Sequence, residues 1–291
     1  MIVDCFIFFN EIALLNMRLK ELYSVIDLFV VVEAGETFSG QKKPFYIDLY
    51  KDQIEDPDDK LIYIKLPALP PIAGNGEKER FWLESYHRNA VMQGLLQCNL
   101  KHEDYVLLSD IDEIPSASSV SEFIENCGDD DIWQFSQLFL KGYFDEDMDD
   151  GYNRRFWGGT VGVRYSVFGK TMPQELRREV AVSGQIINYA LARNRDVRIL
   201  EKAGWHLSSF GGALSREYKL SHYAHGIMNK AILDDHGVRV QLGSHSDLSM
   251  NSTSEINEFI GALEAELQYN LPKDVRENAL KYSRFFKEYD K

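Results

Sequence analysis

Strand-sized apolar runs alternate with helical patterns along the first part of the chain, and this alternation restricts the fold more than any other feature. Four runs predict buried strands, at Ile2–Phe9, Leu28–Glu33, Lys60–Leu66 and Tyr105–Ser109. Between them, helices are predicted from Ile12 to Leu22, with Asn10 as the cap, and over Phe81–Gln97. Long connections of this kind join parallel strands. The pattern therefore predicts an α/β fold with a mixed, mainly parallel sheet.

The remainder of the chain extends this prediction. Further strands rich in aromatic residues are expected at Ile132–Leu140 and Gly159–Phe168, and Pro272 is expected to open a last helix. The apolar face of that helix is Val275, Ala279, Tyr282 and Phe286. Because no repeat or Gly/Ser linker interrupts the chain, we expect one continuous domain over residues 1–291. Its expected segments are 1–115, 116–250 and the C-terminal helices 251–291.

Charge and composition exclude several classes of protein. The chain has 32 basic and 46 acidic residues, a formal net charge of −14, and such a surface repels nucleic acids and anionic membranes. Its apolar runs are too short to span a bilayer, and no secretory signal is recognisable. Cys5, Cys98 and Cys127 show no metal-site or redox spacing. We therefore expect a soluble protein of a reducing compartment, with no nucleic-acid partner and no stable membrane insertion.

The most informative candidate site lies where the fourth predicted strand ends. Asp110, Asp112 and Glu113 follow that strand directly, and Pro115 is expected to stop regular structure there. In open α/β sheets, ligands bind at the carboxyl ends of the strands. Carboxylates this close are costly unless a cation neutralises them, and Mg²⁺ or Mn²⁺ commonly takes one or two carboxylates plus substrate phosphates. The acids therefore indicate a divalent-metal site, with a capping turn as the alternative.

A second candidate segment is Gly204–Gly212, which contains Trp205 and His206. Glycines around an aromatic-rich turn indicate a constrained backbone near a ligand. The imidazole of His206 is a candidate third metal ligand, and a core side chain is the alternative. Two common nucleotide motifs are absent, since neither G-x-G-x-x-G after the first strand nor G-x-x-x-x-G-K-[ST] occurs. Dinucleotide and P-loop sites are thus excluded at the motif level.

The chain also carries a series of motifs in a fixed order. It opens with Asp4-Cys5-Phe6-Ile7-Phe8-Phe9-Asn10-Glu11 and Arg18-Leu19-Lys20-Glu21-Leu22. The later motifs are Val32-Glu33, Thr37-Phe38-Ser39-Gly40, Arg88-Asn89, Ser109–Pro115, Trp157-Gly158-Gly159 and Gly204-Trp205-His206-Leu207-Ser208. Together they resemble glycosyltransferase family 17, from about residue 2 to beyond residue 212. That family includes the β-1,4-mannosyl-glycoprotein 4-β-N-acetylglucosaminyltransferases.

The resemblance implies a GT-A-like nucleotide-sugar-binding fold, with a nucleotide-binding half over residues 1–115 and an acceptor and metal half over residues 116–250. It also implies a UDP-sugar donor, Mn²⁺ or Mg²⁺, and transfer of a sugar, above all N-acetylglucosamine, to a glycan or glycoconjugate hydroxyl with inversion. By the same resemblance, Asp110, Asp112 and His206 bind the metal, and Glu113 is their companion acid. By the same resemblance, Asp110 also contacts the bound UDP-sugar.

Further residues are assigned to the donor and the sugar. By the resemblance, Glu33 looks like a contact to the nucleoside, and Arg88 contacts the diphosphate or orients the acidic loop. Trp157 is the leading candidate to stack on a sugar ring, since a large aromatic face suits such a contact. Further aromatic candidates are Tyr143, Phe144 and Trp205.

The expected mechanism is a single in-line displacement, in which the metal stabilises the leaving group and a carboxylate deprotonates the acceptor hydroxyl. The sequence offers Asp145, Glu146 and Glu217 as candidates for this general base, because each lies in or near a segment expected to border the cleft. A solvated surface charge is the alternative interpretation for each of them.

The chain departs from the family at two points. It has Lys219–Gly226 where a Ser-His-rich stretch ending near an acid is expected, and the anchor and stem of eukaryotic members are not recognisable. The acceptor is therefore left open, with a lipid-linked or surface-polysaccharide precursor favoured over a secreted glycoprotein. The expected location is the cytoplasm of a bacterium, or of a host cell if the gene is viral.

Two other functions use the same features. A metal-dependent phosphohydrolase would use the acidic cluster, release phosphate or nucleotide without a sugar acceptor, and have no need of His206. A non-catalytic carbohydrate-binding module would keep the fold without turnover, although the intact acidic and Gly-Trp-His motifs disfavour it.

Overall fold

A computed structural model describes residues 1–74, 76–144, 156–181, 197–210, 257, 260–265 and 269–286. The chain divides into two compact units, which we call unit 1 (residues 1–138 and 156–206) and unit 2 (residues 139–155 and 207–291). The single domain expected over residues 1–291 stays a prediction.

The described elements of the first half alternate between strand and helix, as predicted. The strands there are β1 (Ile2–Phe8), β2 (Leu28–Ala34), β3 (Leu61–Leu66), β4 (Tyr105–Asp110) and β5 (Glu113–Pro115). The helices are α1 (Ile12–Leu22), α2 (Tyr46–Leu49), a 3₁₀ helix (Lys51–Gln53), α3 (Glu77–Asn89), α4 (Val91–Leu95) and α5 (Ala117–Asn126).

The second half contributes mainly antiparallel strands and short helices. Its strands are β6 (Ile132–Lys141), β7 (Phe156–Arg164), β8 (Val197–Leu200) and β9 (Gly204–Ser208). Its described helices include a 3₁₀ helix (Tyr165–Gly169), α6 (Pro173–Ala181), α11 (Lys273–Glu277) and a 3₁₀ helix (Ala279–Phe285).

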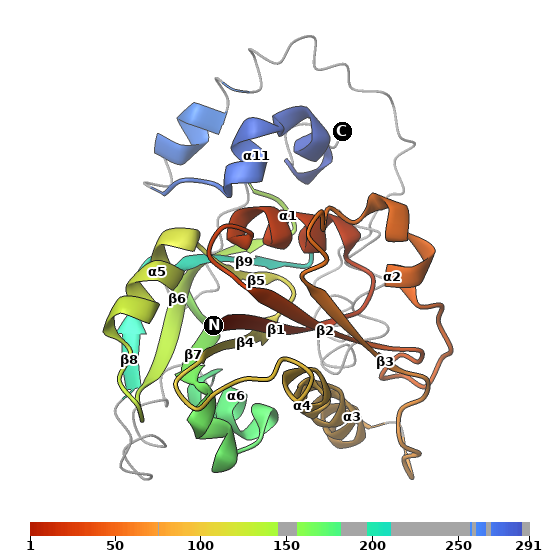
Figure 1. Ribbon diagram of the computed structural model, residues 1–291. Helices are drawn as coiled ribbons and strands as arrows, with labels where there is room; N and C mark the ends of the chain where they lie inside the picture. Colours follow the sequence, from red (N-terminus) through yellow and green to blue (C-terminus); the bar gives the residue numbers. More distant parts are fainter. Residues whose placement is uncertain are drawn as a thin grey trace. The chain divides into compact units, whose positions relative to one another are not determined.

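Nine described strands form one sheet in the order β3-β2-β1-β4-β7-β6-β9-β5, with β8 paired to β6. Strands β3, β2, β1 and β4 are parallel to one another, whereas β7 pairs with β4 and β6 in the antiparallel sense. Helices α3 and α4 cover one face of the parallel strands and α1 covers the other (Figure 1). This confirms the predicted α/β fold with a mixed, mostly parallel sheet.

Burial explains why the parallel strands read as uninterrupted apolar runs. Every residue of β1 is buried, because helices cover both of its faces. In α1, apolar residues spaced three to four positions apart, including Leu15, Leu19 and Leu22, face the same core. The four strands predicted in the first half therefore lie within one residue of the observed bounds.

The structure corrects several local predictions. The cap of α1 is Glu11 rather than Asn10, and the Glu11 carboxylate accepts from the backbone N–H groups of Phe9 and Asn10. The helix predicted over Phe81–Gln97 begins earlier and divides at Ala90 into α3 and α4. The short strand β5 ends at Pro115, as the predicted stop requires, and helix α5 begins after the cap Ser116.

In unit 2, the predicted apolar face of the last helix is buried. Pro272 precedes α11, as expected, but this helix ends at Glu277 and a 3₁₀ helix follows, so the prediction of a single last helix was wrong. The four residues of the predicted face are nevertheless at most 3% exposed, namely Val275, Ala279, Tyr282 and Phe286. Phe144 also lies in this cluster, where its ring contacts those of Phe210 and Phe286. Phe144 is therefore a core residue, and the prediction that it stacks on a sugar is wrong.

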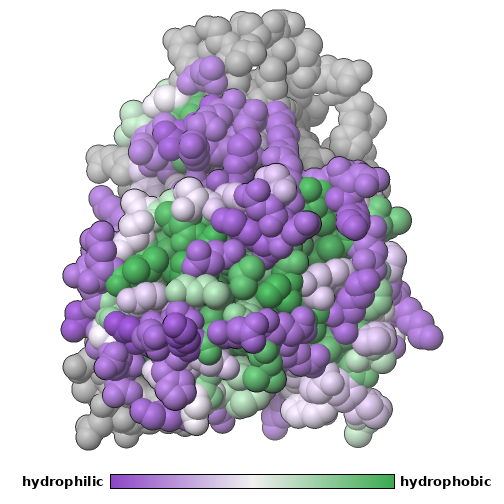
Figure 2. Space-filling model, viewed as in Figure 1, coloured by the Kyte–Doolittle hydropathy of each residue, from purple (hydrophilic) through white to green (hydrophobic). Residues whose placement is uncertain are grey.

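One face of the surface is drawn in Figure 2, where hydrophilic side chains predominate and apolar ones gather near the middle. Exposed apolar side chains are ordinary for folded proteins, because apolar atoms make up roughly half of their surface. Among the described helices, none is both long and apolar enough to cross a membrane.

A buried histidine links the sheet to α3. His87 is 4% exposed, and its Nε2–H donates to the carbonyl of Val32 in β2 at 2.9 Å. Burial, together with the charge of neighbouring Arg88, lowers the pKa of His87 from 6.5 to about 4. The folded protein therefore holds this imidazole neutral at pH values where the unfolded chain protonates it.

We predict that stability decreases as the pH falls from 6.5 to 4, because the unfolded state then binds a proton that the folded state does not. At about 1.4 kcal/mol for each pKa unit, the loss attributable to His87 is about 3 kcal/mol. Urea unfolding of wild type and His87→Gln at several pH values measures it. The variant should show a shallower decrease, and His102→Gln, at an exposed position, should behave like wild type. Equal pH dependence in wild type and His87→Gln would contradict the assignment.

Candidate active site

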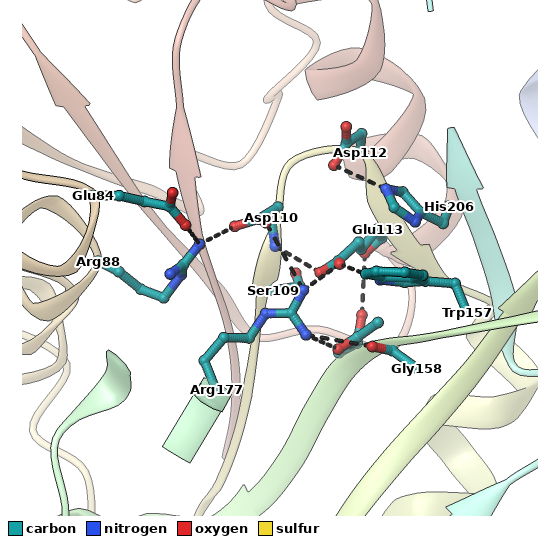
Figure 3. A network of polar contacts seen from close by, with 12 residues as sticks. Glu84, Arg88, Ser109, Asp110, Asp112, Glu113, Trp157, Gly158, Arg177 and His206 are labelled. Carbon is teal, nitrogen blue, oxygen red and sulfur yellow. Dashed lines mark hydrogen bonds and ion pairs between the residues drawn. The ribbon is translucent and has the colours of Figure 1, made fainter. Parts of the chain in front are cut away.

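The acidic segment predicted from the sequence forms a tight turn between β4 and β5. Asp110 ends β4, Ile111 and Asp112 form the turn, and Glu113 begins β5 (Figure 3). Ile111 is buried and anchors the turn in the core. The three carboxylate side chains differ in exposure, at 34% for Asp110, 9% for Asp112 and 2% for Glu113. The three carboxylates therefore differ in their access to solvent.

Strand pairing brings the second predicted motif to this turn. Strand β9 pairs antiparallel with β5, which places His206 opposite Glu113 and Gly204 opposite Pro115. Gly204 has a φ of +128°, and a Cβ atom there would lie 2.2 Å from the carbonyl oxygen of Ile114. Only glycine permits so close an approach in that conformation. Gly204, Trp205 and His206 begin strand β9, so this segment is a strand rather than the expected turn. The glycine lets β9 lie close against β5, and the pairing places His206 beside the acids.

Asp112 and His206 face each other across this strand pair. Asp112 Oδ1 lies 3.8 Å from His206 Nε2, which is beyond a normal hydrogen bond. The imidazole ring also packs against the indole of Trp157, with ring centroids 5.3 Å apart and an interplanar angle of 50°. The side chains of Asp112, His206 and Trp157 lie together beside the turn between β4 and β5 (Figure 3).

Asp110 is held by arginines. Its Oδ1 accepts from Arg88 Nη2 at 2.7 Å, and its Oδ2 lies 3.8 Å from Arg177 Nη2. Arg88 also donates to Glu84 at 2.8 Å and to Gln174. Burial acts to raise the pKa of Asp110, but the two guanidinium charges outweigh it and hold the pKa below its usual range. Asp110 is therefore ionised at neutral pH.

Glu113 is enclosed by protein donors. Its Oε2 accepts from the backbone N–H of Asp110 at 2.9 Å, and its Oε1 accepts from Trp157 Nε1 at 3.1 Å and from Arg177. Burial raises the pKa of Glu113, and the charge of Asp110 adds to the rise while that of Arg177 opposes it.

A buried ion pair lies beneath the turn. Arg18 of α1 and Asp4 of β1 are both fully buried and share two hydrogen bonds of 2.6 Å. Arg18 also donates to Ser109 Oγ at 2.6 Å and to the carbonyls of Asp110 and Glu113 at 3.2 and 2.8 Å. All five N–H donors of the guanidinium group are thereby used, and three of them hold the segment that carries the acids.

Two side chains, Asp112 and His206, lie near enough to each other to be candidates for a shared divalent ion. Mg²⁺ holds its ligands at about 2.0–2.1 Å in octahedral geometry, so adjacent ligand atoms lie about 3 Å apart and opposite ones about 4 Å apart. The separation of 3.8 Å between Asp112 Oδ1 and His206 Nε2 lies between these distances, so a small side-chain movement would let both bind one ion. Among the described residues, no three His, Cys, Asp or Glu side chains gather as metal ligands. The pair fits an ion whose other ligands are waters and substrate phosphates, and the three-residue set that adds Asp110 stays a prediction.

Glu33 is buried away from solvent at the end of β2. Its Oε1 accepts from Lys43 Nζ and the backbone N–H of Tyr46, both at 2.6 Å. Its Oε2 accepts from the Tyr63 hydroxyl at 2.6 Å and the backbone N–H of Ile47 at 3.2 Å. Both oxygens thus hold the segment that follows β2, and the predicted nucleoside contact stays a prediction.

The other predicted residues have different outcomes. The three candidate bases, Asp145, Glu146 and Glu217, lie outside the described residues. Trp205 is 4% exposed, so the prediction that it stacks on a sugar is wrong, and its place is in the core. Trp157 is half-buried beside His206, and its sugar contact stays a prediction.

Sequence reasoning missed the structural roles of Arg18 and Arg177. A signal for Arg18 existed, because Asp4 interrupts an apolar strand and a buried carboxylate requires a partner. For Arg177 no signal was available, since the helix α6 that carries it was not predicted. Its contacts with Glu113 and with the carbonyl of Gly159 arise only when distant segments meet.

Comparison with protein families identifies a match over the first part of the chain. Residues 1–159, more than half of the chain, match glycosyltransferase family 17. The chain belongs to this family.

Curated relatives have more distant similarity. Human β-1,4-mannosyl-glycoprotein 4-β-N-acetylglucosaminyltransferase is 28% identical over 228 residues, which cover 68% of this chain and 38% of the human protein. The protein of the same name from Rattus norvegicus is 30% identical over 62% of this chain and 28% of its own length. The chain thus spans well under half of the length of these relatives.

Solved structures match the chain at low sequence identity and low TM-score. Glucosyl-3-phosphoglycerate synthase from Mycobacterium tuberculosis, crystallised with Mn²⁺, UDP and phosphoglyceric acid, is 12% identical with a TM-score of 0.40, over 82% of this chain and 79% of that one. A galactosyltransferase bound to donor and acceptor sugar analogues is 13% identical with a TM-score of 0.37, over 95% and 99%. Scores this low support no residue-by-residue correspondence.

We predict that Arg18→Met lowers the free energy of unfolding by about 3–5 kcal/mol, because it leaves Asp4 as an unpaired charge in the core. Adding Asp4→Leu removes that charge, so the double variant should recover part of the loss. Urea unfolding of the two single variants and the double variant measures the coupling. Arg198→Met is the control, because its ion pair with Asp131 is half-exposed and should contribute about 1 kcal/mol or less. Equal losses in Arg18→Met and Arg198→Met would contradict the prediction.

Proposed function

We propose that this protein is a metal-dependent, inverting glycosyltransferase with a GT-A-like fold that transfers N-acetylglucosamine from a UDP-sugar to a glycan hydroxyl. Membership of glycosyltransferase family 17 supports sugar transfer, and the names of the curated relatives support N-acetylglucosamine. The observation that carries the metal site is the Asp112–His206 pair at the turn after β4.

Charge explains why a divalent cation suits this turn. A UDP-sugar carries an anionic diphosphate, which the carboxylate of Asp112 repels, while Arg88 and Arg177 offset the charges of Asp110 and Glu113. Asp112 and His206 are the residues that hold Mn²⁺ or Mg²⁺ in this proposal, and Asp110, fixed by Arg88, adds negative charge beside them. When bound, such an ion stabilises negative charge on the leaving nucleotide. The donor therefore binds only together with the cation.

The protein side chains divide the remaining tasks. Arg88 orients the acidic turn through Asp110, which is the second of the two roles predicted for it. Trp157 offers its aromatic ring to the sugar beside the bound cation. A carboxylate deprotonates the acceptor hydroxyl, and the predicted candidates are still Asp145, Glu146 and Glu217.

The acceptor is proposed by chemical class alone. We propose a lipid-linked or surface-polysaccharide precursor as the acceptor and the cytoplasm as the location. The human and rat relatives are named for a mannosyl-glycoprotein acceptor, which is the other glycan to include in a test.

We predict that UDP-N-acetylglucosamine binds in the presence of Mn²⁺ and not in its absence, and that Asp112→Asn and His206→Gln weaken this binding. Turnover should decrease about 100-fold or more in Asp112→Asn, because metal ions contribute several kcal/mol to transition-state stabilisation. Calorimetry with a panel of UDP- and GDP-sugars measures donor binding, and release of UDP with added acceptors measures transfer. Asp52→Asn, an isosteric change of an exposed acid, is the matched control and should resemble wild type.

The same experiment separates the competing functions. Release of phosphate without an acceptor, lost in Asp112→Asn, would identify a phosphohydrolase. Binding of glycans without turnover of any donor would identify a carbohydrate-binding module. If no nucleotide sugar binds with or without Mn²⁺, the proposed transferase function is wrong.

A further inference from the structure

A chain of contacts runs from α6 to the imidazole of His206. Arg177 of α6 is buried and pairs with the Glu113 carboxylate. The same Glu113 oxygen accepts from the indole N–H of Trp157 at 3.1 Å. The Trp157 indole in turn packs on the ring of His206, 5.3 Å away between centroids. Four side chains from four separate elements are thereby linked, as Figure 3 shows.

The hydrogen bonds of Glu113 make it the middle member of this series of contacts. Both of its oxygens are occupied by protein donors, with Oε2 accepting from the backbone of Asp110 and Oε1 from Trp157 and Arg177. Protein donors thus occupy three of the four acceptor sites of this carboxylate. These contacts orient neighbouring groups, and the companion-acid role that the family resemblance implies stays a prediction.

Arg177 ties this carboxylate to the strand that carries Trp157. Its Nη1 donates to the carbonyl of Gly159 in β7 at 2.6 Å. A Cβ atom at Gly159 would lie 1.7 Å from Gln137 Oε1, so a larger residue would displace the strand or that side chain. Because one planar guanidinium group holds both Glu113 and β7, it fixes the distance between the carboxylate and the indole.

Backbone pairing alone does not orient the imidazole. The pairing of β5 with β9 fixes the Cα position of His206, but the ring can still rotate about its side-chain torsions. The packed indole restricts that rotation and keeps Nε2 toward Asp112. Groups that orient a metal ligand without touching the metal commonly influence affinity about 10–100-fold.

We propose that Arg177 and Glu113 are a pair of positioning residues that fix the indole of Trp157 against His206 and so orient the imidazole toward Asp112. This inference rests on the proposed function, because it concerns how a metal-binding imidazole is held. It assigns to Glu113 a role distinct from metal ligation, and to Arg177 a role that no sequence motif indicated.

The first test observes the Trp157 indole directly. With ¹⁵N-labelled tryptophan, the protein gives four indole N–H signals, and the one absent from Trp157→Phe belongs to Trp157. In Arg177→Gln and Glu113→Ala this signal should shift and exchange with water at least about tenfold faster, since its hydrogen bond to a charged acceptor is weakened or lost. Arg88→Gln is the matched control, because Arg88 is equally buried and binds the same turn through Asp110.

The second test measures binding of Mn²⁺ alone by the electron paramagnetic resonance signal of the free ion. Arg177→Gln and Trp157→Phe should each bind Mn²⁺ about tenfold or more weakly than wild type. Trp157→Phe retains an aromatic ring and the Arg177–Glu113 pair, so it tests the hydrogen bond even if Arg177→Gln fails to fold. Arg177→Lys keeps the charge but not the forked donor geometry, and should restore only part of the affinity.

The outcomes separate this inference from the proposed function. If the indole signal is unchanged in Arg177→Gln and Glu113→Ala, or changes equally in Arg88→Gln, the positioning role is wrong. If Trp157→Phe binds Mn²⁺ as tightly as wild type, the hydrogen bond does not orient the imidazole and the inference is also wrong. If wild type binds no Mn²⁺ while its indole signal still depends on Arg177, the metal site of the proposed function fails and the positioning of the indole stands.

Discussion

The ion pair between Arg18 and Asp4 is the interaction on which the acidic turn depends. Two charges removed from water are tolerated only when their hydrogen bonds are complete. Arg18 meets this requirement with five donors, two to Asp4 and three to Ser109 and the carbonyls of Asp110 and Glu113. The first strand and the first helix thereby hold the end of the fourth strand. The turn keeps its shape because the carbonyl groups of Asp110 and Glu113 accept hydrogen bonds from the buried guanidinium group of Arg18.

The same segment is constrained from above by strand pairing. Strand β9 lies on β5 in a register that places His206 opposite Glu113, and Gly204 permits the approach by its positive φ and missing side chain. Arg88 and Arg177 then hold the acids from the side of α3 and α6. The three carboxylates have different surroundings, so three acids within four residues coexist without being equivalent. Burial raises the pKa of Glu113, whereas at Asp110 the charges of Arg88 and Arg177 outweigh burial and lower the pKa.

Local patterns predicted the parallel half of the sheet well. Strands β1, β2 and β4 are mostly buried apolar runs, because helices cover both faces of the sheet there, whereas the edge strand β3 is partly exposed. The acids after β4 were recognised for a similar reason, since charged side chains directly after a buried strand lie where the strand emerges at the carboxyl end of the sheet. Less was predicted after residue 115, where α5, α6 and β8 were missed and β9 was interpreted as a turn. Short strands that pair across long sequence separations leave weak periodicity.

The sequence by itself determined the α/β class, the position of the acids at a strand end and the membership of glycosyltransferase family 17. Only the tertiary structure decided how those acids are used. Which carboxylate pairs with an arginine, which is enclosed and which faces His206 depends on contacts between residues up to about a hundred positions apart. Such contacts follow from packing and strand register, because hydrogen bonds and charge act over a few ångströms in space whatever the separation along the chain.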